Sequence, residues 1–276
     1  MRFAPLAARV LAALVALAPI VGHRAAASDD PAPAAPRSIY RIDPALDGAV
    51  TGAALAGIVL PALYARQIIS RRCPCPGSEV NLFDRPAIGN DSHAADLASD
   101  VTLGLALGAP VLADALALRA PAVLVEDVVV FAETLAVAGV LVSAVKYTVQ
   151  RPLPRVYDDH DPVLAAAPGG YRSFYSGHTT LVFAALGSAS MTMGWRDDRW
   201  LAPWLATTIV GGSVAVERVA AGRHFPSDVI VGALTGTAVG IVVPWLHRRP
   251  TATSGVHLGL QELAGGGLAL AARGRL

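Results

Sequence analysis

Long uncharged stretches recur along the chain and predict most of its secondary structure. Four stretches hold 17 or 18 residues without Asp, Glu, Lys or Arg: 49–65, 179–195, 200–216 and 229–246. Two more apolar segments, 97–118 and 121–145, are interrupted by acidic residues. Because a spanning helix needs about 20 apolar residues, each uncharged stretch lies near the lower limit for a span. The pattern predicts an all-α bundle of about six apolar helices, embedded in a membrane.

Acidic residues inside these segments constrain how the helices face their surroundings. Glu126 and Glu133 are seven residues apart, so they share one face of the helix predicted over 121–145. A carboxylate against lipid is costly, and we therefore expect this face to look into the bundle or toward water.

The N-terminal region predicts an export signal. Arg2 and Arg9 are followed by an apolar run and by three small residues at 25–27, which together indicate a signal peptide over residues 1–27. Cleavage is favoured because the apolar run is shorter than a span, and an uncleaved membrane anchor is the alternative. Residues 28–48 begin with a Pro/Ala-rich segment and are expected to form a linker.

The remaining chain divides into a helical domain and a tail. The domain is predicted over residues 49–250, with its core at 95–246. Residues 251–276 combine strand-like alternation with a Gly-rich turn, which fits either a short hairpin or a frayed tail.

Composition narrows the class of protein. Of the 276 residues, 54% are apolar and 16% are charged, with a mean hydropathy of +0.50. A typical soluble domain carries about 25% charged residues, so this composition excludes disorder, a coiled coil and a solvated nucleic-acid binder. The net charge of +1 provides no broad basic field for a polyanion.

The two cysteines lie in a turn-rich loop predicted over residues 66–96. Cys73 and Cys75 cannot form a disulfide framework, and a bridge between residues two apart is expected to be strained. Metal binding and oxidation both stay open, although no second cysteine pair or histidine cluster lies nearby in the sequence.

Three polar islands interrupt the apolar pattern, and residues 173–180 form one of them. Ser176 can cap the helix that follows, and Gly177 lets the backbone approach a ligand closely. Free N–H groups and the positive helix end then form an anion pocket with His178 at its rim. A plain helix cap with an incidental histidine is the alternative.

A second island covers residues 218–228. His224 and Asp228 are four residues apart, so the carboxylate can accept the imidazole Nδ1–H. That bond would leave Nε2 free to attack an electrophile, as in a catalytic triad. Arg218 offers a fork of donors to an oxyanion. The alternative is a basic interfacial loop capped by an acid.

The third island, residues 146–155, begins with Lys146 at the exit of an apolar helix and carries Arg151 and Arg155. By itself it fits a snorkelling lysine and an arginine-rich membrane boundary. Because it precedes the other two islands in the sequence, it also fits a set of three motifs that together form one site.

The order of the islands resembles the type 2 phosphatidic acid phosphatase superfamily, which also includes bacterial class A acid phosphatases and vanadium haloperoxidases. In that superfamily, K-x6-R-P precedes P-S-G-H and S-R-x5-H-x3-D. The resemblance covers roughly residues 95–246. The matching residues are Lys146, Ser176, Gly177, His178, Arg218, His224 and Asp228.

Three positions depart from the superfamily pattern. Tyr175 replaces the usual proline and Glu217 the usual serine, and neither change need abolish the chemistry. Leu153 stands where the first motif has its arginine. Arg151 matches an additional arginine of many members, and Arg155 lies two residues after Leu153, so we expect one of them to bind phosphate instead. If neither does, weak phosphate affinity follows.

The resemblance implies hydrolysis of a phosphoester without a metal or another cofactor. Lys146, Arg218, one of the two arginines and the N–H groups of the Ser-Gly-His island would hold the phosphoryl oxygens. His224, oriented by Asp228, would attack phosphorus and form a phosphohistidine. His178 would protonate the leaving alkoxide and then activate water as a base.

The expected substrate is a lipid phosphate such as phosphatidate or undecaprenyl pyrophosphate, met at a membrane, and no nucleic-acid partner is expected. An exported phosphatase for soluble phosphomonoesters is one alternative. A degenerate membrane scaffold is another, motivated by Leu153. The sequence does not define the oligomeric state.

Parity and charge bear on the location of the site. Two helices separate the connections 146–178 and 217–228, so an up-and-down path returns both to one face. A cleaved signal with six spans places that face in the cytoplasm, whereas five spans place it in the periplasm. We favour the inner membrane with a periplasm-facing site, and a soluble periplasmic bundle is the alternative. The positive-inside rule supports this choice for the arginines that would then lie in the cytoplasm: Arg119, Arg196, Arg199, Arg248 and Arg249. It opposes the choice for those that would lie outside: Arg66, Arg71 and Arg72.

Overall fold

The computed structural model describes residues 37–70, 73–118, 120–250, 257–262 and 268–273. Within them, six helices have 20 or more residues: α2 Pro44–Leu63, α4 His93–Ala117, α5 Pro121–Val149, α7 Gly177–Asp197, α8 Leu201–Ala220 and α9 Pro226–His247. The prediction of an all-α bundle of about six apolar helices is confirmed. The predicted signal at 1–27 lies outside the described residues.

Local sequence signals set where the long helices begin. The Asp43 side chain accepts hydrogen bonds from two first-turn N–H groups of α2, so this helix starts five residues before the predicted domain boundary. Ser92 and Ser176 cap α4 and α7 in the same way. α5 and α9 each begin with a proline, whose missing N–H costs nothing at that position.

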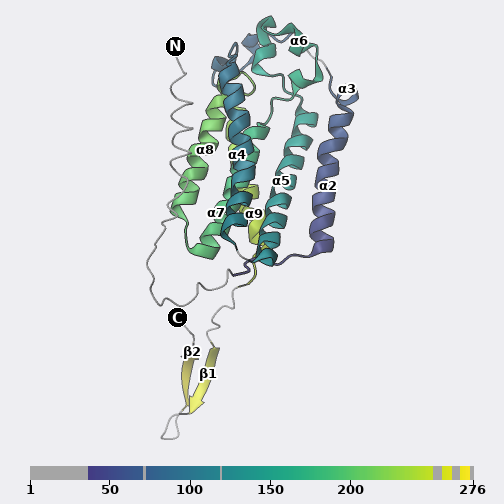
Figure 1. The fold of residues 1–276 in the computed structure, drawn as a ribbon. Coiled ribbons are helices and arrows are strands. Elements are labelled where there is room, and N and C mark those ends of the chain that lie inside the picture. The colour runs from purple at the N-terminus through teal and green to yellow at the C-terminus, as the bar shows by residue number, and fades with distance from the viewer. Residues whose placement is uncertain (1–36, 71–72, 119, 251–256, 263–267, 274–276) are drawn as a thin grey trace.

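The bundle is organised around α7. This helix contacts α9, α8, α5 and α4, while α2 packs on α5 at the edge (Figure 1). α7 and α9 approach closely because α9 presents a row of glycines to its neighbour, Gly232, Gly236 and Gly240. A Cβ on any of these would lie 2.8 Å or less from a backbone oxygen of α7 or of its cap residue. Small residues thus set the spacing of the two helices whose first turns contain His178 and Asp228.

Shorter elements gather at one end of the bundle. They comprise α3 Ala65–Ile68, η1 Gly77–Glu79, η2 Arg85–Ala87, η3 Pro154–Asp159, α6 Pro162–Ala165 and η4 Pro168–Tyr171. Figure 1 shows α3 and α6 at the same end as the connection from α8 to α9. The up-and-down path therefore brings the three polar islands to one end of the molecule.

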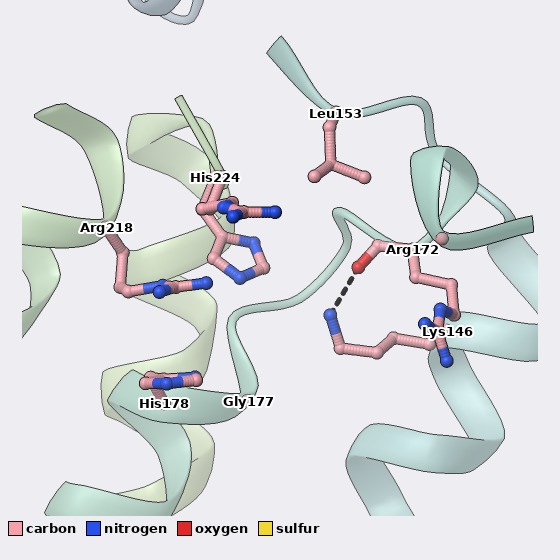
Figure 2. A pocket seen from close by; sticks show the side chains of 9 residues that line it. Lys146, Leu153, Arg172, Gly177, His178, Arg218 and His224 are labelled. Atoms are coloured by element: carbon pink, nitrogen blue, oxygen red, sulfur yellow. Dashed lines mark hydrogen bonds between the residues drawn. The ribbon is translucent and has the colours of Figure 1, made fainter. Parts of the chain in front are cut away.

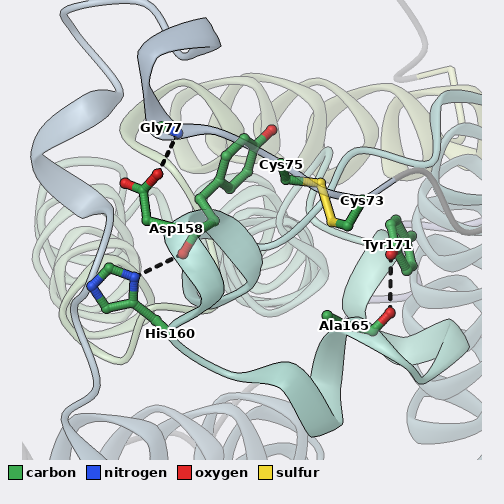
Figure 3. The surroundings of a disulfide bond; sticks show 8 residues. Cys73, Cys75, Gly77, Asp158, His160, Ala165 and Tyr171 are labelled. Carbon is green, nitrogen blue, oxygen red and sulfur yellow. Dashed lines mark hydrogen bonds between the residues drawn. A yellow bond between two sulfur atoms is a disulfide. The ribbon is translucent and has the colours of Figure 1, made fainter.

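The loop before α4 contains a disulfide between Cys73 and Cys75 (Figure 3). The open alternative of metal binding by these cysteines is therefore contradicted by the structure. Cys75 packs against a cluster containing Tyr157 and Phe225, and Cys73 against one containing Tyr171. The bridge thus joins two small apolar clusters that lie beneath the loops.

The described part of the tail forms an antiparallel hairpin, which is one of the two sequence-based alternatives. It consists of β1 His257–Glu262 and β2 Leu268–Arg273, with Leu260 opposite Leu270.

Four helices are long and apolar enough to cross a membrane: α2, α4, α5 and α9. α7 and α8 are not among them, although their sequences also predicted spans near the lower limit. α7 lies in the middle of the bundle, where its Ser, Thr and Gly residues contact other helices rather than the exterior. Large apolar side chains such as Leu112, Ile209 and Leu234 are exposed on the outside. The four apolar helices and this exposed apolar surface suggest a membrane protein.

Candidate active site

The three polar islands converge on a cavity of about 260 Å³ (Figure 2). It is lined by Lys146, Leu153, Gly169, Arg172, Gly177, His178, Arg218, Arg223 and His224. Five of the sequence-predicted site residues are in this set: Lys146, Gly177, His178, Arg218 and His224. The other three, Arg151, Ser176 and Asp228, are not among the lining residues.

His224 lies at the centre of this group and is 5% exposed. Its Nδ1 is 2.7 Å from the carbonyl oxygen of Ser173. Because a carbonyl oxygen can only accept, Nδ1 carries the proton and Nε2 keeps its lone pair. Burial lowers the pKa of His224 to about 3, and the charge of Lys146 adds to this effect. The imidazole is therefore neutral at physiological pH, as a nucleophile requires.

Asp228 acts differently from the sequence-based expectation. Its Oδ2 lies 3.8 Å from His224 Nδ1, beyond hydrogen-bond distance. This oxygen instead accepts from Ser173 Oγ and from the Phe225 N–H, the latter at 2.9 Å. The reason is local, since a carboxylate in the first turn of a helix satisfies free N–H groups at the helix start. Asp228 thus holds Ser173, whose carbonyl in turn fixes the tautomer of His224.

Arg151 lies in an ion-pair network rather than on the cavity wall. Its guanidinium is 2.7 Å from Asp228 Oδ1 and 2.8 Å from Asp84 Oδ2, and it stacks 4.0 Å from the centroid of the Phe225 ring. Burial alone would raise the pKa of Asp84, but hydrogen bonds from Arg151 and Ser227 lower it. Both acids are therefore charged partners that hold Arg151 away from the phosphate position expected from sequence.

Arg155 does not reach the cavity either, because it pairs with Asp91 at 3.1 Å and with Asp161 at 3.2 Å. Leu153 lines the cavity and is 6% exposed. Two other arginines occupy the wall: Arg172, which donates to the Tyr147 hydroxyl at 3.2 Å, and Arg223. Neither residue was predicted from the sequence. Arg172 directly precedes the island 173–180 and Arg223 lies inside the island 218–228, and these positions were the available signal.

Lys146 and the start of α7 form another part of the wall. Lys146 Nζ donates to the Arg172 carbonyl, which holds the ammonium beside Gly177 (Figure 2). Ser176 is fully buried and accepts from the Thr179 N–H. Among the described contacts, the N–H groups of Gly177 and His178 have no acceptor. These first-turn donors at the positive end of α7 suit an anion.

Acidic residues of α4 position the remaining cationic groups. Asp100 Oδ1 is 2.7 Å from His178 Nε2, and Asp96 binds Arg218 at 2.7 Å and Arg223 at 2.6 Å. Burial and the charge of Arg218 lower the pKa of His178 overall, and the carboxylate at Nε2 opposes this by favouring the protonated imidazole that a general acid needs. The sequence indicated Asp100 only as an interruption of an apolar segment. Its role depends on α4 packing against α7 and α8.

Comparison with known proteins identifies a family for part of the chain. Residues 127–252 match the model of the PAP2 superfamily, and they contain all three motifs. This part of the chain belongs to the PAP2 superfamily. The match supports a phosphatase of the PAP2 type. Asp84, Asp96 and Asp100, which organise the site, lie outside the matched segment.

Further comparisons add one similar structure. The crystal structure of Aquifex aeolicus LpxE is 25% identical, with a TM-score of 0.42, and the match covers 58% of this chain and 90% of that one. A search of curated proteins found no matching sequence.

Proposed function

We propose that this PAP2 protein is a metal-independent phosphatase that hydrolyses a lipid phosphate through a phosphohistidine. The observation that carries the proposal is the state of His224, a buried, neutral imidazole whose Nδ1–H is held by a carbonyl. Around it stand four cationic side chains, those of Lys146, Arg172, Arg218 and Arg223. This is a nucleophile inside an anion-binding cavity.

Binding uses these cations together with the free N–H groups at the start of α7. They contact the non-bridging phosphoryl oxygens, where negative charge is spread in the transition state. Arg218 is positioned for this by Asp96 and by Ser99 Oγ at 3.1 Å. Positioning before the reaction matters because fixed donors need no reorganisation as the charge develops.

In the first chemical step, the Nε2 lone pair of His224 forms a bond to phosphorus while the phosphorus–ester oxygen bond breaks. His178, protonated and paired with Asp100, gives its proton to the leaving alkoxide. In the second step, the now neutral His178 takes a proton from water, the hydroxide oxygen bonds to phosphorus, and the bond to Nε2 breaks. Inorganic phosphate leaves, and both histidines return to their initial states.

Asp228, Arg151 and Asp84 serve as positioning residues in this mechanism. Asp228 accepts from Ser173 Oγ, whose residue holds the His224 imidazole through its carbonyl, and from the N–H of Phe225, the residue after His224. Arg151 pairs with Asp228, and Asp84 accepts from the Ser227 N–H in the first turn of α9.

A lipid substrate is supported by the surroundings of the cavity. Four helices of the bundle are long and apolar enough to span a membrane, so the cavity at the end of the bundle would face lipid headgroups. Leu153 provides an apolar contact on the wall, suited to the alkyl side of a phosphoester. An enzyme that hydrolyses soluble phosphomonoesters would not need the exposed apolar surface of this bundle.

The test is phosphate release by purified protein in detergent, with a lipid phosphate as substrate and EDTA present. We expect turnover without added Mg²⁺, inhibition by vanadate, and a loss of at least about 10³-fold with His224→Ala, because the nucleophile is removed. His93→Ala provides a matched control, since His93 is exposed at the same end of the bundle. Equal turnover by wild type and His224→Ala would refute the mechanism. A soluble phosphomonoester as the better substrate would refute the lipid assignment.

A further inference from the structure

A second cluster of ionisable residues lies at the other end of the bundle. Asp47 from the first turn of α2, Glu133 from α5 and His247 from the last turn of α9 come together there, and all three are mostly buried. His247 Nε2 is 3.4 Å from Asp47 Oδ1 and 3.6 Å from Glu133 Oε2. One ligand atom from each residue lies within 4.8 Å of the others. The cluster joins three helices far from the phosphatase cavity.

Hydrogen bonds aim two of these groups into the cluster. His247 Nδ1 donates to the Val243 carbonyl at 2.9 Å, so the ring presents Nε2 to the two carboxylates. Asp47 Oδ2 accepts from the Asp43 N–H at 2.9 Å, which leaves Oδ1 toward His247. Such outer contacts are typical of metal-binding histidines and carboxylates, because they fix the tautomer and the orientation of the ligand.

Glu133 supplies an independent indication of a ligand. Its side chain is 9% exposed, and Oε2 has no hydrogen-bond partner within the described part of the chain. A buried carboxylate oxygen without a donor is costly unless a cation or a proton compensates it. Oε2 is the atom that points toward His247.

Charge and geometry agree on a divalent cation. No ion pair joins Asp47 or Glu133 to a lysine or arginine among the described residues, so two carboxylates face one imidazole. One protonated histidine would leave the cluster with a net negative charge, whereas one divalent ion neutralises it. In a tetrahedral site with bonds of about 2.1 Å, ligand atoms are roughly 3.4 Å apart, which matches the two separations from His247 Nε2.

We propose that Asp47, Glu133 and His247 bind a structural first-row divalent cation of the Zn²⁺ type, which clamps α2 to α5 and α9. One nitrogen and two carboxylate oxygens suit Zn²⁺, and the fourth position is open to water. The ion takes no part in the phosphatase chemistry.

The experiment uses full-length protein purified through a histidine-free affinity tag, so that the tag binds no metal. After treatment with chelator and its removal, Zn²⁺ binding is measured by titration and by elemental analysis. We expect one Zn²⁺ per chain and a Zn²⁺-dependent rise of the melting temperature, because the ion binds only the folded state. Mg²⁺, which prefers oxygen ligands and retains its water, should not produce this rise at the same concentration.

Glu133→Gln and His247→Gln should each weaken Zn²⁺ binding at least about tenfold and abolish the rise in melting temperature. Glu126→Gln is the matched control, because Glu126 lies on the same helix and pairs with Arg249 outside the cluster. It should bind Zn²⁺ as wild type does. The proposal is overturned if wild type binds no more Zn²⁺ than Glu133→Gln. That result would mean that protons, and not a metal ion, compensate the charge of the two carboxylates. Phosphate release plays no part in the readout.

Discussion

At the scale of single residues, the cavity contains other arginines in place of the motif arginine that this chain lacks. Leu153 occupies the wall where a phosphate-binding arginine is expected, and neither Arg151 nor Arg155 turns into the cavity. The two arginines are held elsewhere by acids. Arg172 and Arg223 line the same cavity from other segments.

This arrangement predicts which arginines bind the substrate. Arg172→Ala and Arg223→Ala should each lower kcat/KM about 10- to 100-fold, because each removes a charge-assisted hydrogen bond to phosphate. Arg172→Lys should recover part of the loss by restoring the charge. Steady-state kinetics on a lipid phosphate measure the effect.

Arg155→Ala is the control for that series, since its partners are Asp91 and Asp161 in the neighbouring loops. It should leave kcat/KM within about twofold of wild type. The assignment fails if Arg155→Ala is impaired while the variants at 172 and 223 are not.

At the scale of elements, the distance between α7 and α9 determines the geometry of the proposed active site. His178 lies in the first turn of α7, and Asp228 in the first turn of α9. The glycines of α9 let the helices approach until Gly236 lies against the Thr180 backbone. A wider spacing would separate the two motifs even if every catalytic side chain were present.

Gly236→Ala should therefore destabilise the protein by about 1–3 kcal/mol, because its Cβ would lie 2.3 Å from the Thr180 carbonyl oxygen. Gly104→Ala on α4 is the matched control, since nothing lies within 4 Å of its Cβ. There, alanine should be neutral or stabilise by up to about 1 kcal/mol through helix propensity. Melting temperatures in detergent measure both effects. Equal melting temperatures for the two variants would show that this close approach is not required.

At the scale of the whole molecule, the disulfide and the charges bear on which side of the membrane the cavity faces. The Cys73–Cys75 bridge lies at the cavity end, because Cys75 packs on the cluster that contains Phe225, the residue after His224, and disulfides persist in oxidising compartments. Arg196, Arg248 and Arg249 lie at the opposite end, as the positive-inside rule expects for the cytoplasmic side. Both observations support the proposal that the cavity faces the periplasm.

Site-directed labelling in intact cells tests this orientation. After mild reduction, Cys73 and Cys75 should react with a membrane-impermeant maleimide. Ala202→Cys, placed at the opposite end in a Cys73→Ser/Cys75→Ser background, should react only after lysis. The reverse pattern would place the cavity in the cytoplasm, as a cleaved signal with six spanning helices requires.

The sequence by itself determined the six helices and the residues of the three motifs. Both depend on short-range properties, namely runs of apolar residues and the fixed spacing of residues such as Arg218, His224 and Asp228 around one helix start. These properties need no partner elsewhere in the chain.

Only the tertiary structure decided which partners those residues take. Asp228 binds Ser173 and Arg151, more than 50 positions away, instead of the histidine four positions away. Asp100 reaches His178 across 78 positions, and Arg151 turns to Asp84 across 67. A charged side chain binds the opposite charge or hydrogen-bond donor that lies nearest to it in the folded protein. Helix packing brings these groups together from distant segments, and their separation in the sequence does not predict the contact.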